Sequence, residues 1–199
     1  MPWPLPSFFR LISIRKKLDF GCAFQDLLHG LWRAFLNELQ EGGMRIYLVD
    51  DRGINGEYAA FWHTYKDRFP AFTLDVFTHW ASLYQAIQNA MPDLIIADMR
   101  FDEIHRDQLY GDIEALANSE RFCGNRERAE TQIRGMQGLL ICRALREHQI
   151  HTPIILFATL QPQIIDNIVQ TLAPIRIIKG LILDQIIAAY NDILPNQTI

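Results

Sequence analysis

The sequence predicts an α/β fold, an open parallel sheet with helices on both faces. From residue 44 onward, five short apolar runs alternate with five segments of helical periodicity. The apolar runs are nearly continuous, as is typical of strands that are buried on both faces. The chain has 199 residues, 49% of them hydrophobic, so it can bury such a core without disulfide bonds.

The strands are predicted from runs such as RIYLV, DLIIA and PIILFA, which are shorter than a usual helix. In chain order, strands are expected at 45–49, 72–77, 93–97, 153–158 and 175–178. Amphipathic helices are expected at 57–69, 80–90, 136–148, 163–172 and 184–194. The regular alternation of the two predicts a doubly wound, five-stranded sheet.

An insertion interrupts this alternation after the third strand. Residues 99–137 hold 14 charged residues out of 39, so most of this interval should be solvated. Tyr110, Ile113, Leu116 and Phe122 keep some apolar spacing. We therefore expect one helical segment packed over the domain, within an insertion at about 100–136.

Residues 1–43 are predicted to be an N-terminal helical extension of a domain at 44–199. The stretch 18–40 has helical periodicity with a wide apolar surface, and ends at a glycine pair. Three interpretations remain open: a partner or homodimer surface, a helix folded back on the domain, and a helix lying on a membrane. A further possibility is that Met44 is the true start of the protein.

The composition excludes several classes of function. The net charge of −4 gives no basic excess, so we expect no nucleic acid partner. The three cysteines are far apart, which favours a reducing cytoplasm over a disulfide framework or a zinc site. No apolar run reaches the roughly 18 residues of a membrane span, and no secretory signal is visible.

Three carboxylates follow strand ends. Asp50 and Asp51 come after the first strand and Asp98 after the third. In the flavodoxin-like strand order 2-1-3-4-5, these strands are neighbours at the point where the order reverses, which is where open sheets bind ligands. Converging carboxylates are costly without a cation, and an all-oxygen set suits Mg²⁺. We therefore predict Mg²⁺ as the cofactor.

Two further donors lie on the same edge of the predicted sheet. The fourth strand ends in Thr159 and the fifth in Lys179, a hydroxyl and an ammonium group. Together with a carboxylate nucleophile and a divalent ion, these groups can hold a phosphoryl group.

The sequence resembles the receiver domain of two-component response regulators. The resemblance covers residues 44–199 and rests on RIYLVDD, PDLIIADM, Gly138 in GLLICRALRE, TPIILFAT and IRIIK. It implies that Asp98 accepts a phosphoryl group. The Mg²⁺ ligands would be Asp50, Asp51, Asp98 and the backbone carbonyl of Arg100. Phosphoryl oxygens would be bound by Thr159 and Lys179.

The sequence departs from the family at the switching residues. Leu160 follows the Thr in place of a small residue, Arg176 replaces the switch aromatic, and Gly180 replaces the Pro after the Lys. The insertion also begins directly after Asp98. We therefore hypothesise that the insertion reports phosphorylation in place of the usual switch, or else that it is a permanently ordered decoration. The residues proposed to close over the phosphoryl group are Arg106, Arg121 or Arg126.

The function predicted from the resemblance is a cytoplasmic receiver, not an enzyme, phosphorylated on Asp98 in a Mg²⁺-dependent phosphorelay. Its partners would be a histidine kinase or phosphotransfer protein and a downstream protein target. The alternative is a pseudo-receiver that acts as a phosphorylation-independent interaction module. A haloacid-dehalogenase-like phosphatase is set aside because it needs an Asp two positions after the nucleophile, where Arg52 and Arg100 stand.

Overall fold

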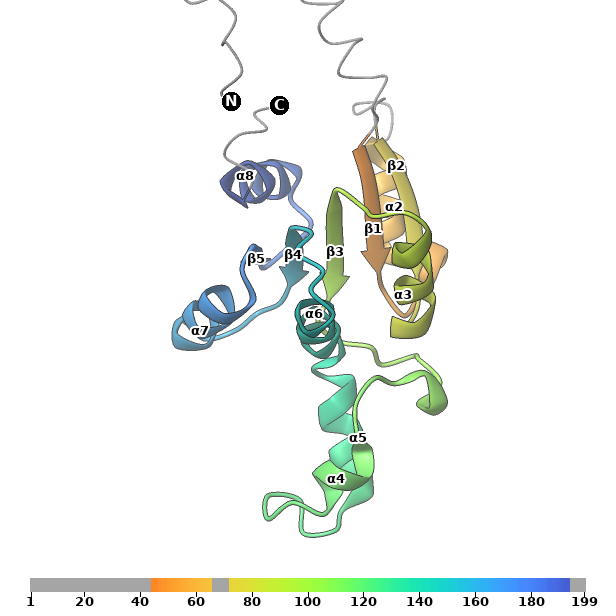
Figure 1. Cartoon of the computed structure of the whole chain (residues 1–199), viewed down its shortest axis with the longest axis vertical. Helices are drawn as coiled ribbons and strands as arrows, with labels where there is room; N and C mark the ends of the chain where they lie inside the picture. Colours follow the sequence, from red (N-terminus) through yellow and green to blue (C-terminus); the bar gives the residue numbers. More distant parts are fainter. Residues whose placement is uncertain (1–43, 66–71, 194–199) are drawn as a thin grey trace, which may run out of the picture. The chain divides into compact units, whose positions relative to one another are not determined.

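The computed structural model describes residues 44–65 and 72–193. The extension expected at 1–43, with the domain boundary at its end, lies outside the described residues. Five strands form one sheet in the order β2-β1-β3-β4-β5, with every neighbouring pair parallel. The strands are β1 Met44–Val49, β2 Phe72–Phe77, β3 Leu94–Asp98, β4 Ile154–Phe157 and β5 Ile175–Ile178 (Figure 1). The predicted fold class and strand order are confirmed.

The helices that connect the strands also form where the periodicity predicts them. They are α2 Glu57–Tyr65, α3 Trp80–Asn89, α6 Gln137–Glu147, α7 Pro162–Leu172 and α8 Leu183–Ile193. Their described ends lie within one residue of the predictions, apart from α2, which is described only to Tyr65. Within the described ranges, no helix combines the length and the apolar character that a bilayer span requires.

Alternate strand residues enter two separate cores, one on each face of the sheet. Tyr47 and Val49 of β1 pack in a core with residues of α3, α6 and α7. Ile46 and Leu48 of the same strand pack in a second core with residues of α2 and α8. The period of two along a strand therefore explains why both faces are covered by helices.

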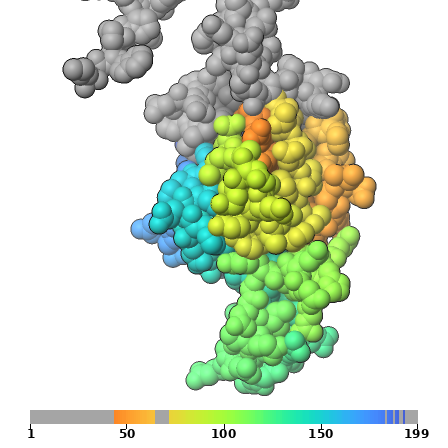
Figure 2. Space-filling view, turned by 45° about the vertical axis from the view of Figure 1, so that its right-hand side comes forward, coloured from red at the N-terminus to blue at the C-terminus, as the bar shows by residue number. Residues whose placement is uncertain are grey.

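The insertion forms two α-helices, so the single helix expected there is wrong. The helices are α4 Ile113–Ala117 and α5 Arg126–Arg134, and a 3-10 turn, η4 Arg106–Gln108, precedes them. Each α-helix begins at a side-chain cap: Asp112 accepts a hydrogen bond from the third residue after it, and so does Asn125. Figures 1 and 2 show α4 and α5 extending away from the sheet.

The insertion has a small core of its own and a root in the main core. Ala117, Phe122 and Ala129 are buried against one another between α4 and α5. At the root, the side chain of Phe101 is fully buried in the core that also holds α3, α6 and α7. The backbone N–H of Phe101 donates to the carbonyl oxygen of Arg134 at 2.9 Å, so the two ends of the insertion meet.

The buried amide of Gln137 fixes a second point of the insertion. Its Oε1 accepts from the backbone N–H of Tyr110 at 2.6 Å, and its Nε2 donates to the Tyr110 carbonyl at 2.8 Å. The ring of Tyr110 in turn contacts Trp80 of α3, with 5.2 Å between ring centroids. The insertion is thus ordered against the domain at its root.

Candidate functional site

The three predicted carboxylates lie at the carboxyl edge, the edge of the sheet where the carboxyl ends of the strands meet. Val49 of β1 pairs with Ala97 of β3 at the end of their ladder. Asp50 and Asp51 directly follow Val49, and Asp98 directly follows Ala97 as the last residue of β3. Burial raises the pKa values of Asp50 and Asp98, and the negative charge of Asp51 adds to the rise in both.

Asp50 is the most buried of the three, with 1% of its surface exposed. Its Oδ1 accepts from the backbone N–H of Arg52 at 3.1 Å, whereas its buried Oδ2 has no hydrogen-bond partner in the part of the chain that the structure describes. The backbone of Gly56 passes so close to Oδ2 that a Cβ there would overlap it. Burial, and then the charges of Asp98 and Asp51, raise the pKa of Asp50 to about 6, against the lowering effect of the Arg52 amide.

Asp98 is half-buried, and hydrogen-bond donors from the helix α2 and from its own loop hold its carboxylate. The hydroxyl of Tyr58 donates to Oδ1 at 3.1 Å, and the backbone N–H of Met99 donates to the same oxygen at 2.8 Å. Burial raises the pKa of Asp98, and these hydrogen bonds oppose that rise. Burial and the negative charge of Asp98 also raise the pKa of Tyr58, which keeps its hydroxyl protonated as a donor.

Tyr58 is a residue of the site that no motif in the sequence singles out. It stands in the first turn of α2, one position after Glu57. Because α2 starts a few residues after β1 ends, its first turn must lie over the carboxyl edge. That placement is the signal by which Tyr58 could have been predicted.

The beginning of the insertion is tied to the loop after β1. Asp51 accepts a hydrogen bond from the backbone N–H of Glu103. The Glu103 carboxylate also pairs with the guanidinium of Arg52, with 3.1 Å between Oε1 and Nε. Both side chains of this ion pair are more than half exposed, so its contribution to stability is small. The main-chain bond to Asp51 is the firmer tie, and it places the insertion beside the predicted metal ligands.

Gly138 brings helix α6 against the end of β3. Its backbone N–H donates to the carbonyl oxygen of Met99 at 3.1 Å. A Cβ at this position would overlap the carbonyl oxygen of Asp98, so the close approach requires glycine. The glycine that the resemblance picks out therefore positions the backbone of the predicted phosphoacceptor.

Thr159 and Lys179 follow strands whose carboxyl ends lie on the carboxyl edge, and within the described residues no hydrogen bond or ion pair connects them to the carboxylates. β4 and β5 are neighbours, and the two residues follow their carboxyl ends. Both side chains are exposed, and within the described residues neither makes a hydrogen bond or ion pair. Arg176, which replaces the switch aromatic, pairs with Asp192 of α8 at 3.3 Å. Its guanidinium is thereby held at α8.

The donor chemistry of the carboxyl edge suits Mg²⁺, although its carboxylates are not gathered into a finished ligand set. The buried Oδ2 of Asp50 is an oxygen acceptor with no partner, beside two further carboxylates. Among residues 44–65 and 72–193, no three acidic, His or Cys side chains are grouped closely enough to hold a metal ion. The predicted ligands Asp50, Asp51, Asp98 and the Arg100 carbonyl therefore remain a prediction.

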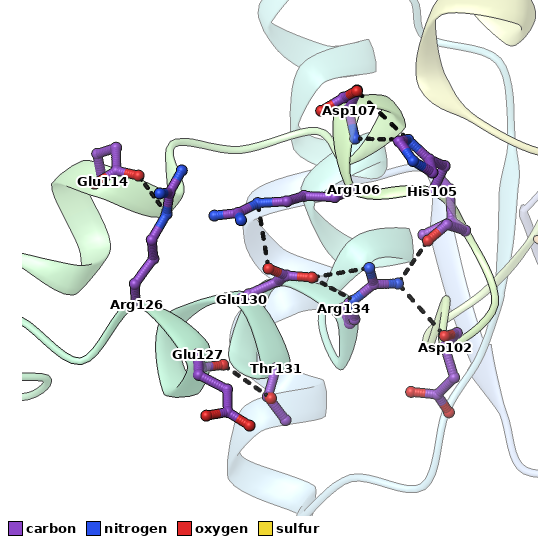
Figure 3. Close-up of polar contacts among 11 residues, drawn as sticks. Asp102, His105, Arg106, Asp107, Glu114, Arg126, Glu127, Glu130, Thr131 and Arg134 are labelled. Carbon is purple, nitrogen blue, oxygen red and sulfur yellow. Dashed lines mark hydrogen bonds and ion pairs between the residues drawn. The ribbon is translucent and has the colours of Figure 1, made fainter.

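The arginines of the insertion are engaged within it. The Glu130 carboxylate pairs with two of them (Figure 3). The distance from its Oε2 to Nε of Arg106 is 3.3 Å, and the distance from its Oε1 to Nη2 of Arg134 is 2.9 Å. Arg134 also donates to the carbonyl oxygen of Ile104 at 2.7 Å, which ties α5 to the root. Arg134 therefore connects α5 to the segment that follows β3.

The other two arginines expected to close over a phosphoryl group also have partners in the insertion. Arg126 pairs with Glu114 of α4 at 2.6 Å (Figure 3). Arg121 donates to Gln132 at 3.5 Å and lies over the ring of Phe122, 5.3 Å from its centroid. Closure of these arginines over a phosphoryl group would have to break these contacts, and it stays a prediction.

Comparison with solved structures places the chain among receiver folds. The signal receiver domain of a putative LuxO repressor protein from Vibrio parahaemolyticus matches with a TM-score of 0.51 at 16% identity, covering 77% of this chain and 91% of that one. The receiver domain of nitrogen regulatory protein C matches with a TM-score of 0.50 at 14% identity, covering 79% of this chain and 98% of that one. A two-component response regulator from Clostridium difficile matches at 0.50 and 15% identity, covering 78% and 99%.

The chain has the receiver fold. No protein-family model and no curated protein matches the sequence. In this receiver fold the residues carried over from the resemblance occupy the expected landmarks at the strand ends, and the insertion takes the position directly after Asp98.

Proposed function

We propose that this chain is a response-regulator receiver that is phosphorylated on Asp98 in a Mg²⁺-dependent phosphorelay. The phosphodonor would be a histidine kinase or a phosphotransfer protein in the cytoplasm. The phosphorylated domain would act as a signalling module, not as an enzyme, through contact with a downstream protein.

One observation carries the proposal: three carboxylates lie at the carboxyl ends of two neighbouring strands of a receiver fold, and the buried oxygen of one has no partner among the described residues. Carboxylates crowded in this way are costly, because burial and mutual repulsion both disfavour their charged forms. A cation bound there removes both costs. The Asp50 oxygen therefore supports a cation site over a purely structural cluster.

The proposed chemistry assigns each residue a task. The Asp98 carboxylate attacks phosphorus, and Asp50, Asp51, Asp98 and the Arg100 carbonyl would hold Mg²⁺. When bound, Mg²⁺ supplies positive charge that offsets the charge on the transferring phosphoryl group. Thr159 and Lys179 are the proposed donors to phosphoryl oxygens, because both lie on this edge and have no partner within the described residues.

A pseudo-receiver is the second candidate, and a specific observation favours it. Asp98 and Asp51 already accept hydrogen bonds from Tyr58 and Glu103, which are the protein's own donors. A domain that never binds a phosphoryl group could satisfy its carboxylates in this way. The ordered insertion would then serve as a fixed interaction surface.

Phosphorylation of the full chain by acetyl phosphate separates the two candidates. In the presence of Mg²⁺, intact-mass spectrometry should show the addition of one phosphoryl group to the wild-type protein. Asp98→Asn should abolish the addition, whereas Asp75→Asn, which removes an exposed carboxylate on β2, should leave it unchanged. A wild-type protein that gains no mass with acetyl phosphate or with a histidine kinase would favour the pseudo-receiver.

A further inference from the structure

Tyr58 is the side-chain donor that the structure gives to Asp98. Within the described part of the chain, no other side chain donates a hydrogen bond to this carboxylate. Lys179, which the resemblance assigns to this region, is exposed and makes no ion pair with it. A neutral hydroxyl thus occupies the position of a direct partner of the predicted phosphoacceptor.

The position of the Tyr58 hydroxyl is fixed by packing. The Tyr58 ring lies against Phe157, the residue of β4 that pairs with Asp98, with 4.8 Å between ring centroids. The next residue on α2, Ala59, is fully buried in the core beneath the helix. Because the ring and the helix are both held, the hydroxyl reaches Asp98 without a large loss of side-chain freedom.

The two oxygens of Asp98 are therefore not equivalent. Oδ1 accepts two hydrogen bonds, from the Tyr58 hydroxyl and from the backbone N–H of Met99. The backbone N–H of Arg100 is a further donor to the Asp98 carboxylate and lowers its pKa. Oδ2 accepts no hydrogen bond from any described side chain, so the Tyr58 hydroxyl distinguishes the two oxygens.

We propose that Tyr58 is a positioning residue for phosphoryl transfer, fixing Oδ1 so that Oδ2 of Asp98 is the oxygen that attacks phosphorus. The inference rests on the proposed receiver function. With acetyl phosphate as donor, the Oδ2–P bond forms while the P–O bond to the acetyl group breaks. The electron pair of that bond leaves with acetate, so no proton or further reactant is needed. An acyl phosphate on Asp98 and free acetate are the products.

Tyr58→Phe tests the role, because it removes the hydroxyl and keeps the ring that packs on Phe157. The initial rate of phosphorylation of the full chain by acetyl phosphate at saturating Mg²⁺ should fall about tenfold, the effect of losing a hydrogen bond to a charged group. The acetyl phosphate concentration that gives the half-maximal rate should not change. The fraction finally labelled should equal that of the wild type, which a misfolded variant would not reach.

Tyr47→Phe is the matched control. The Tyr47 hydroxyl donates to the carbonyl oxygen of Ala90 at 2.9 Å, away from the carboxyl edge, so this variant should be labelled at the wild-type rate. If Tyr58→Phe reacts within about twofold of the wild type, or if both variants slow equally, the positioning role is refuted while the receiver function stands. If the wild type itself takes no phosphoryl group, the proposed function fails, and this inference fails with it.

Discussion

Replacing Asp50 by Asn should stabilise the domain at neutral pH. The Asn Oδ1 can still accept from the Arg52 amide, and the substitution removes a buried negative charge. Burial and the neighbouring carboxylates raise the pKa of Asp50 from 3.8 to about 6. The folded protein therefore keeps this proton over a pH range in which the unfolded chain has already lost it, so stability falls as the pH rises through that range.

The size of this stabilisation follows from the difference between the two pKa values of Asp50. Each pH unit between the two pKa values corresponds to about 1.4 kcal/mol, so the charged carboxylate costs about 3 kcal/mol once the pH exceeds both. Urea unfolding without Mg²⁺, at a series of pH values between about 4 and 8, measures this cost. The free energy of unfolding of Asp50→Asn, minus that of the wild type, should increase with pH and level off above about pH 7.

The change with pH is the decisive quantity in this experiment. An Asn amide that lacks a partner carries its own cost, but that cost does not depend on pH. Asp75→Asn removes an exposed carboxylate on β2, so its free energy of unfolding relative to the wild type should show no comparable rise with pH. If the free energies of unfolding of Asp50→Asn and the wild type differ by the same amount from acid to neutral pH, the argument from buried charge is refuted.

Two further substitutions test how the site is supported. Gly138→Ala should lower the free energy of unfolding by about 2 kcal/mol or more, because the added Cβ would overlap a backbone carbonyl at the end of β3. In the control Gly180→Ala, the added Cβ lies in open space, so its free energy of unfolding in urea should stay within about 0.5 kcal/mol of the wild type. Equal losses of stability in the two variants would contradict the close approach of Gly138 to β3. Arg146→Met should lower the free energy of unfolding by about 3 kcal/mol or more, as measured by thermal denaturation. The Arg146 guanidinium donates to four backbone carbonyls, three of them within 3.0 Å. The exposed Arg143→Met should be nearly neutral, and a comparable loss there would mean that the four hydrogen bonds contribute little.

The sheet could be predicted from local sequence, and the neighbouring positions of Asp50 and Asp98 follow from the strand order. A run such as IILF in β4 is apolar at every position, and only a strand buried on both faces uses such a run. Once the strand order is known, residues that directly follow two neighbouring parallel strands must lie side by side. Asp50 and Asp98 are such a pair.

The contacts that complete the site could not be predicted, because they depend on side-chain placement across elements. Tyr58 reaches Asp98 only because its ring packs on Phe157, a residue distant in sequence. In the insertion, α4 has only five residues and α5 has few apolar ones, so the helical periodicity is weak there. Their caps, Asp112 and Asn125, are the signals that could have divided one expected helix into two.

The hydrogen bond between Phe101 and Arg134 has a consequence for how this domain can diverge. The chain leaves the sheet region at Phe101 and returns at Arg134, one hydrogen bond away. Closing a loop whose ends already touch costs little more when the loop grows, since the entropy rises only with the logarithm of its length. The outer insertion, residues 113–129 with the small core of Ala117, Phe122 and Ala129, can therefore be lengthened, shortened or exchanged while the strands and the carboxyl edge keep their geometry. The outer insertion is the part of this protein in which new binding specificity can arise at least cost to the fold.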